Sequence, residues 1–213
     1  MKTTDFQKGV LRTCSADFQK ISPRLNEWAV NFLHGLCGMA DEIGELLLAD
    51  DKPNAIEELG DFLWYDALSY HAIGKEFYFD SESCIDGRYS DMKYTIEIDC
   101  NDIMKHVGEL NGMFKAYLFY GREFDAEKAY EQLSKVTRIA FGCCYRIGSS
   151  PEDVMRKNQE KLRARYPEKY FTEERANERD LEKEQAILRD KPTPEVDLPI
   201  KSIVEPFVPS SDE

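Results

Sequence analysis

The chain has 213 residues, of which 28 are basic and 41 acidic, so its formal net charge is −13. This acidic balance argues against general binding to nucleic acid or to anionic membranes. Hydrophobic residues make up 42% of the chain, enough for a substantial core, and no segment approaches the roughly 20 apolar residues that span a bilayer.

Apolar residues recur at helical spacing through most of the chain. This periodicity predicts helices over 3–20, 26–50, 54–74, 99–121, 125–148 and 151–164. We therefore expect an all-α fold, a helical bundle of about five or six helices built on antiparallel hairpins.

Residues that favour helix starts and ends support these boundaries. The expected starts are Pro53 after Asp51, Asp99, Asp125, and Ser150 followed by Pro151. Oxygen-bearing side chains cap a helix N-terminus, and proline fits its first turn. Gly74 and Gly148 stand where the preceding helices should end, since glycine adopts the left-handed conformation that terminates a helix.

Residues 76–98 interrupt the helical pattern and predict an irregular loop, with a short strand at 93–98. Residues 172–190 are expected to form a highly charged helix, polar nearly all round, that docks only loosely. The segment 191–213 contains five prolines and few large apolar residues, which predicts an extended or disordered tail. We expect one helical domain over 1–171, followed by this helix and tail.

A faint internal repeat relates the two predicted hairpins, an acidic one over 26–74 and a second over 99–148. An offset of 74 residues places Gly38-Met39 on Gly112-Met113, Leu59 on Leu133 and Ile73-Gly74 on Ile147-Gly148. The acidic residues do not repeat, because Ala116 stands opposite Glu42. Either the second hairpin is a duplicate that lost its acids, or two amphipathic hairpins are similar by chance.

The six cysteines show no Cys-x-x-Cys spacing. Two of them, Cys37 and Cys143, lie in apolar helical surroundings. Reduced, buried thiols explain this usage better than disulfides or a zinc site. Together with a polar N-terminus that lacks the apolar stretch of a signal peptide, they predict a cytoplasmic protein.

Two pairs of carboxylates stand in the first predicted hairpin, Glu42 with Glu45 and Glu58 with Asp61. Positions three apart on a helix face nearly the same way, so each pair lies together beside an apolar stripe. The short connection around 48–53 makes the two helices antiparallel. This arrangement can turn both pairs toward one point.

Such a convergence is electrostatically costly. Residues 41–61 hold eight acidic side chains and one basic side chain, and carboxylates within a few ångströms raise one another's pKa. A divalent cation relieves the repulsion, and ligation by oxygen alone favours Mg²⁺, Mn²⁺ or Ca²⁺ over zinc or copper. The alternative is a solvated acidic helix face. None of the three histidines follows a glutamate by three residues, so a di-iron bundle is not indicated.

A basic helix expected over 151–166 contrasts with the acidic chain. After its first turn it carries five basic side chains against one acidic side chain, with Lys157, Lys161 and Arg165 on successive turns. Cations beside a carboxylate-held metal make a phosphate site. The alternative is an ordinary basic helix C-terminus, which the helix dipole favours.

Together these residues resemble the MazG-like, all-α nucleotide pyrophosphohydrolases. The family's motif is Glu-x-x-Glu, a spacer of about a dozen or more residues, and Glu-x-x-Asp, and it stands here within EIGELL and EELGDFLWY. The stretch SPEDVMRKNQEKLRARYP, residues 150–167, is similar to the family's closing Asn-x-x-Lys-Leu-x-x-Arg-Tyr-Pro element. The resemblance covers 26–74 and 99–167. Because the acids and the basic element are separated by a second hairpin, the arrangement is similar to that of the duplicated, dimeric dUTPase relatives.

The resemblance implies hydrolysis of nucleoside or deoxynucleoside triphosphates between the α and β phosphates, giving a monophosphate and pyrophosphate. It implies Mg²⁺ as the cofactor, with Mn²⁺ as the alternative, and the expected ligands are Glu42, Glu45, Glu58 and Asp61. Glu45 and Glu42 are the catalytic candidates, with Glu45 as the proton acceptor. The candidates for phosphate binding are Lys157, Asn158, Lys161 and Arg165.

The sequence encodes the choice of base poorly. The aromatic candidates for stacking on a base are Trp28 and Phe32, followed by His34, Trp64 and Tyr65. Core packing is the alternative for each. We expect a small-molecule nucleotide as partner, neither nucleic acid nor membrane, and a homodimer, since members of the family act as dimers or tetramers.

Two other functions stay open. One is a narrower substrate within the same chemistry, such as dUTP, dCTP or an alarmone. The other is a non-catalytic helical protein that senses nucleotides or binds a partner, in which the acids hold a structural cation.

Overall fold

A computed structural model describes residues 3–14, 17–77, 95–167, 171–177 and 180–189. Over these ranges the chain forms nine α-helices and one 3-10 turn, and it forms no strand, which confirms the all-α expectation. The elements are α1 (Thr3–Thr13), α2 (Phe18–Ile21), η1 (Ser22–Arg24), α3 (Glu27–Leu46), α4 (Lys52–Ala72), α5 (Ile96–Tyr120), α6 (Ala126–Arg146), α7 (Pro151–Arg165), α8 (Glu173–Asn177) and α9 (Leu181–Arg189).

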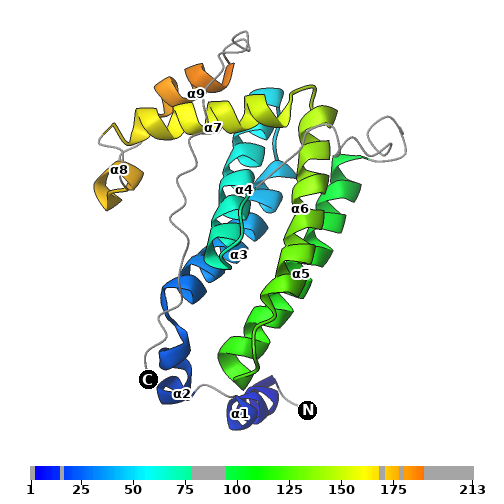
Figure 1. Ribbon diagram of the computed structural model, residues 1–213, viewed down its shortest axis with the longest axis vertical. Helices are drawn as coiled ribbons and strands as arrows, with labels where there is room; N and C mark the ends of the chain where they lie inside the picture. Colours follow the sequence, from blue (N-terminus) through cyan, green and yellow to red (C-terminus); the bar gives the residue numbers. More distant parts are fainter. Residues whose placement is uncertain (1–2, 15–16, 78–94, 168–170, 178–179, 190–213) are drawn as a thin grey trace.

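Two antiparallel helical hairpins form the body of the molecule. Figure 1 shows α3 beside α4 and α5 beside α6, with α7 lying across one end of α4 and α6. Both hairpins turn their apolar faces toward a shared core. Its largest fully buried hydrophobic side chains are Phe32, Leu36, Met39, Leu59, Phe62, Leu63, Ile103, Leu110, Leu133, Phe141 and Leu188.

Most of the expected helix boundaries are confirmed. The side chains of Asp51, Asp125 and Ser150 accept hydrogen bonds from backbone N–H groups in the first turns of α4, α6 and α7. Gly74 and Gly148 both follow their helices with φ of 69°, in the left-handed region. These signals act within a few residues, so they could be recognised before the packing was known.

The start of α5 differs from the expectation. The helix begins at Ile96, and Thr95 caps it by accepting from the backbone N–H of Ile98. Asp99, expected as the cap, lies inside the helix and accepts from Arg146 Nε of α6 at 2.6 Å. The strand expected at 93–98 is therefore wrong for residues 96–98, while residues 93 and 94 lie outside the described ranges.

Two other helices are divided. The helix expected over 3–20 is broken between α1 and α2, and the charged helix expected over 172–190 is divided into α8 and α9. The expectation of a helix that is polar nearly all round is wrong for α9, which has one buried face. Glu184 and Leu188, one turn apart, are 3% and 1% exposed, because they form one buried face of that helix.

The expectation of reduced, buried thiols is met in part. The five cysteines within the described ranges are all unpaired, and Cys143 is buried, but Cys37 is exposed. Cys84, the segment 78–94 of the expected loop and the expected tail at 191–213 lie outside those ranges. Within the described part of the chain, none of the helices combines the length and apolar composition that crossing a membrane requires.

Candidate functional site

The acidic pairs line a cleft of about 1220 Å³. Its walls come from α3, α4, α7 and α9, together with residues between α7 and α8. The lining side chains on α3 and α4 are His34, Glu42, Glu45, Glu57, Glu58, Asp61, Trp64 and Tyr65. The first predicted hairpin therefore contributes one wall, and the basic helix and C-terminal helix contribute the other.

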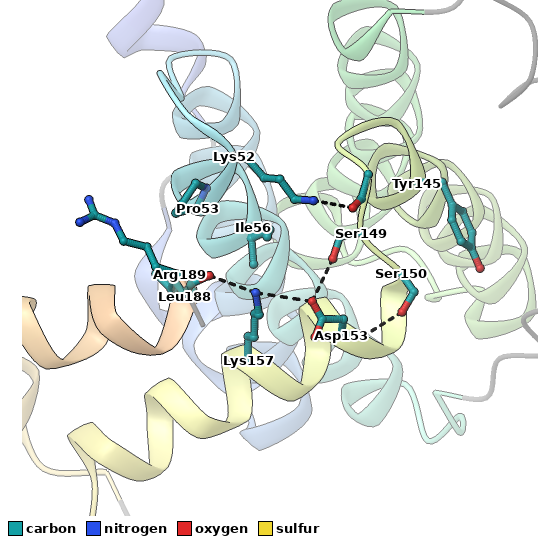
Figure 2. A pocket seen from close by; sticks show the side chains of 11 residues that line it. Lys52, Pro53, Ile56, Tyr145, Ser149, Ser150, Asp153, Lys157, Leu188 and Arg189 are labelled. Atoms are coloured by element: carbon teal, nitrogen blue, oxygen red, sulfur yellow. Dashed lines mark hydrogen bonds and ion pairs between the residues drawn. The ribbon is translucent and has the colours of Figure 1, made fainter. Parts of the chain in front are cut away.

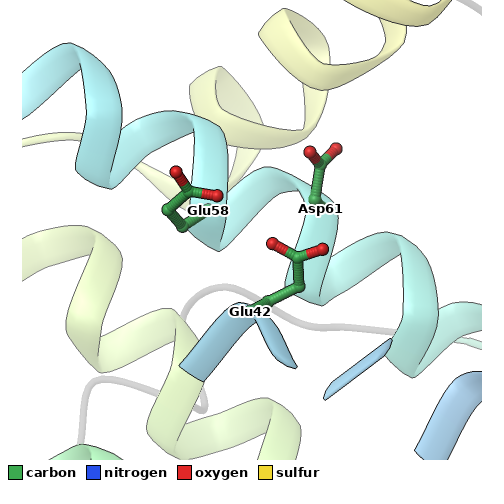
Figure 3. Close-up of side chains that lie close together, drawn as sticks. All are labelled: Glu42, Glu58 and Asp61. Carbon is green, nitrogen blue, oxygen red and sulfur yellow. The ribbon is translucent and has the colours of Figure 1, made fainter. Parts of the chain in front are cut away.

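Three of the four predicted carboxylates converge. Glu42 on α3 and Glu58 and Asp61 on α4 each offer one oxygen, and these oxygens all lie within 4.8 Å of one another (Figure 3). Glu45 lines the same cleft but is exposed and lies outside this group. The three-residue spacing places Glu58 and Asp61 on one face of α4, and the antiparallel hairpin brings Glu42 opposite them.

Two glycines allow the helices to approach closely enough for this geometry. A Cβ at Gly38 of α3 would overlap the ring of Tyr65 on α4. A Cβ at Gly60 of α4 would lie 2.9 Å from the Cβ of Asn158 on α7. Any larger residue would force these helices apart, so glycine at both positions helps to fix where the carboxylates meet.

Two of the converging carboxylates, Glu42 and Glu58, resist ionisation. Burial, followed by the negative charges of the neighbouring carboxylates, raises the pKa of Glu42 to about 9. Burial and the charges of Glu45 and Glu57 raise the pKa of Glu58 to about 7, and Glu58 also accepts from Asn54 Nδ2 at 2.5 Å. At neutral pH this cluster therefore retains a proton unless a cation compensates its charge. Oxygen ligands of this kind fit a hard divalent ion.

Two of the residues predicted to bind phosphate contact Asp61 instead. Lys161 Nζ lies 2.5 Å from Asp61 Oδ2 and 3.3 Å from Glu57 Oε1, and its side chain is fully buried. Asn158 Nδ2 donates to Asp61 Oδ1 at 2.5 Å. Neither residue lines the cleft. In this arrangement α7 supplies internal partners to the acidic face of α4.

The other two residues predicted to bind phosphate, Arg165 and Lys157, contact helix α9. Arg165 lines the cleft and donates from Nε and Nη2 to the two carboxylate oxygens of Glu184, at 2.9 and 2.7 Å. Lys157 Nζ donates to the backbone oxygen of Leu188 at 3.0 Å and lies 3.5 Å from Asp153. Figure 2 shows that Lys157 faces a second cavity, of about 610 Å³, beside Lys52.

Phe32 lies in the core, Trp28 packs against it while partly buried, and neither lines the cleft. Phe32 is fully buried, and both rings pack with Phe114 and Phe124. Phe32 precedes Glu42 by ten residues on α3, which corresponds to about 15 Å along the helix axis. Their placement does not support stacking on a nucleotide base.

Other aromatic side chains do line the cleft. His34, Trp64 and Tyr65 stand on one side, and their rings are 5.1 to 6.0 Å apart between centroids. Tyr166 and Phe171 stand on the other side, with centroids 5.8 Å apart. The sequence did not single out the second pair, although Tyr166 belongs to the closing motif, since nothing local indicates that the chain after α7 returns to the acids.

No protein-family model, no curated protein and no solved structure matches the chain. Its function is therefore inferred from the cleft and from the two motifs that border it.

Proposed function

We propose that the protein is a Mg²⁺-dependent hydrolase that cleaves nucleoside or deoxynucleoside triphosphates between the α and β phosphates, releasing a monophosphate and pyrophosphate. The observation that carries the proposal is the convergence of Glu42, Glu58 and Asp61 within 4.8 Å in a cleft large enough for a nucleotide. The resemblance of both motifs to the MazG-like pyrophosphohydrolases supports the same reaction.

The cation would be held by Glu42, Glu58 and Asp61, with Glu45 beside them. Ligation by carboxylate oxygen alone favours Mg²⁺, and Mn²⁺ is the alternative. The raised pKa values of Glu42 and Glu58 fit this assignment, because they reflect a crowding of negative charge that a divalent ion relieves. When bound, such an ion neutralises phosphate charge and lowers the pKa of a coordinated water.

The chain's own groups then have distinct roles. Glu45 faces the cleft and accepts the proton of the attacking water, whose oxygen bonds to phosphorus as the bond to the bridging oxygen breaks. Arg165, which lines the cleft, binds the phosphate oxygens. Asn158 and Lys161 position Asp61 through the hydrogen bonds described above.

The narrower substrates belong to the same proposal, because aromatic rings stack on any base and do not favour one base over another.

A non-catalytic role in sensing nucleotides or binding a partner is favoured by one observation. Lys161 already compensates the charges of Glu57 and Asp61 from a buried position, so part of the acidic face is satisfied without an ion.

A substrate panel tests the proposal. The full-length protein is incubated with each dNTP, each NTP and a guanosine tetraphosphate alarmone, in Mg²⁺, Mn²⁺ or EDTA, while pyrophosphate and orthophosphate are measured. Metal-dependent release of pyrophosphate is expected, and a strong preference for one nucleotide identifies the narrow-substrate enzyme. Orthophosphate as the only product contradicts the assigned bond, and nucleotide binding without hydrolysis assigns the non-catalytic role.

Two substitutions distinguish the proposed general base from a proposed metal ligand. Glu45→Gln should lower kcat by about 100-fold or more while Mg²⁺ binding persists, whereas Glu58→Gln should lose Mg²⁺ binding as well. Asp41→Asn is the control, since Asp41 is an exposed acid of α3 that does not line the cleft. Unchanged turnover in Glu45→Gln would remove Glu45 from the mechanism.

A further inference from the structure

Helix α9 forms part of the cleft wall and is fixed to α7 and α4 by a few specific contacts. Leu188 packs into the hydrophobic core and is 1% exposed. Gln185 Nε2 donates to Glu57 Oε2 of α4 at 3.3 Å. Leu181, Glu184 and Gln185 line the cleft that holds the carboxylate cluster. Helix α9 therefore borders the space that a ligand of this cleft would occupy.

The polar contacts of α9 engage cations of α7. The Glu184 carboxylate accepts both hydrogen bonds from the Arg165 guanidinium, and the two side chains are 3% and 14% exposed. The backbone oxygen of Leu188, in the last turn of α9, accepts from Lys157. A carboxylate held bidentately by arginine has the geometry and charge of two phosphate oxygens. Glu184 thus occupies the guanidinium edge that a phosphate would use.

The docking of α9 is limited in strength. The helix has nine residues, and an isolated helix of this length is marginal in water. Its docked face includes the buried side chains of Leu188 and Glu184, and Gln185 and the Leu188 carbonyl add hydrogen bonds. A helix this short can exchange between docked and released states.

We propose that α9 is a built-in competitor for the phosphates of the cleft's ligand. In the docked state Glu184 occupies Arg165 and the Leu188 carbonyl occupies Lys157; a polyphosphate chelated by Mg²⁺ displaces Glu184 from Arg165 and releases α9. This inference rests on the proposed function, because it takes the ligand to be a metal-bound polyphosphate. The apparent affinity of the ligand is then reduced by the fraction of molecules in which α9 is docked.

The test measures binding rather than hydrolysis. Inorganic tripolyphosphate with Mg²⁺ is titrated into the full-length protein by isothermal calorimetry. Glu184→Gln, which weakens the contact with Arg165, and Leu188→Ala, which weakens docking without altering charge, should each tighten the Kd by about threefold to tenfold. Glu182→Gln is the matched control, since Glu182 is an exposed acid of the same helix, and its Kd should equal that of the parent.

A second measurement follows α9 directly. Amide hydrogen exchange over 181–189 should accelerate when Mg²⁺-tripolyphosphate binds to the parent protein. Circular dichroism checks that each variant is folded. If Leu188→Ala does not fold, the Kd of Glu184→Gln alone tests the proposal. An unchanged or weakened Kd in Glu184→Gln, unchanged exchange on binding, or no binding in parent and variants overturns the proposal. Tighter binding in a protein that hydrolyses no nucleotide supports it while refuting the proposed enzymatic function.

Discussion

Asp61 lies between two opposite electrostatic environments. Its oxygens accept hydrogen bonds from Lys161 and Asn158, while Glu42 and Glu58 lie close by in the same cleft. A lysine ammonium and a divalent cation are alternative partners for the same carboxylate. If the proposed cation binds, it therefore competes with the buried Lys161 for Asp61.

Replacing this lysine should expose that competition. In EDTA, Lys161→Met should lower the free energy of unfolding by about 2–4 kcal/mol, because Glu57 and Asp61 lose their buried partner. Added Mg²⁺ should restore more stability to this variant than it adds to the parent, as measured by thermal unfolding. Lys105→Met, which removes an exposed pair with Asp102, should change stability by less than about 1 kcal/mol. Equal stabilisation of Lys161→Met and parent by Mg²⁺ would show that lysine and ion do not compete.

A second buried acid, Asp66, lies outside the cleft. It is fully buried between α4 and α6, where Thr137 Oγ1 lies 2.7 Å from its Oδ2 and Tyr70 lies 3.0 Å from the same threonine oxygen. Its Oδ1 has no hydrogen-bond partner among the described residues. Burial raises the pKa of Asp66 to about 8 from its ordinary 3.8, so this side chain is a neutral acid at neutral pH.

This shift predicts how stability depends on pH. The folded state binds a proton at Asp66 that the unfolded state releases above its ordinary pKa of 3.8. The stabilisation is therefore complete below about pH 4 and is lost as pH rises toward about 8. Asp66→Asn has no such proton, so urea unfolding should show the parent losing stability relative to the variant between pH 5 and pH 8. A constant difference across this range would contradict a raised pKa.

At the scale of elements, Gly60 sets the distance between α4 and α7. Gly60→Ala should destabilise the fold by about 1–3 kcal/mol and weaken Mg²⁺ binding, because the added methyl group displaces Asn158 from Asp61. Chemical denaturation and Mg²⁺ titration measure the two effects. Gly44→Ala is the control: this glycine of the first motif has open space around it, so alanine should be neutral or stabilising by up to about 1 kcal/mol. Equal behaviour of both variants would remove the close approach as an explanation.

Helix ends could be predicted where the signal is local and failed where it is not. Asp51, Asp125 and Ser150 cap the helices that follow them within three residues. Thr95 and Asp99 are both able to cap, and what separates them is Arg146, which belongs to α6 and draws Asp99 into the interface. The docked face of α9 was missed, because Glu184 is buried by pairing with Arg165, which lies on another helix.

At the scale of the molecule, the sequence predicted an antiparallel hairpin that brings acidic side chains of two helices together, but not which of the four acids meet. Periodicity placed the acids of α3 and α4 on facing sides, but it could not determine the register between the helices. The observed register brings Gly38 so close to the Tyr65 ring that a Cβ would overlap it, and it leaves Glu45 outside the group of three. Phe32 was predicted as a stacking candidate for the same reason. Its position on α3 is compatible with the core or with a cleft, and only the packing of the second hairpin decides between them.

The two tryptophans of the chain occupy very different surroundings. Trp28 is partly buried and packs against aromatic rings of both hairpins, whereas Trp64 is 43% exposed at the cleft, beside His34. Trp28→Phe thus leaves a single indole whose fluorescence reports on the cleft alone. Its emission should shift or be quenched as Mg²⁺ and nucleotide are added, and Trp64→Phe should abolish the signal. The protein thereby contains its own optical probe of occupancy, independent of any product assay.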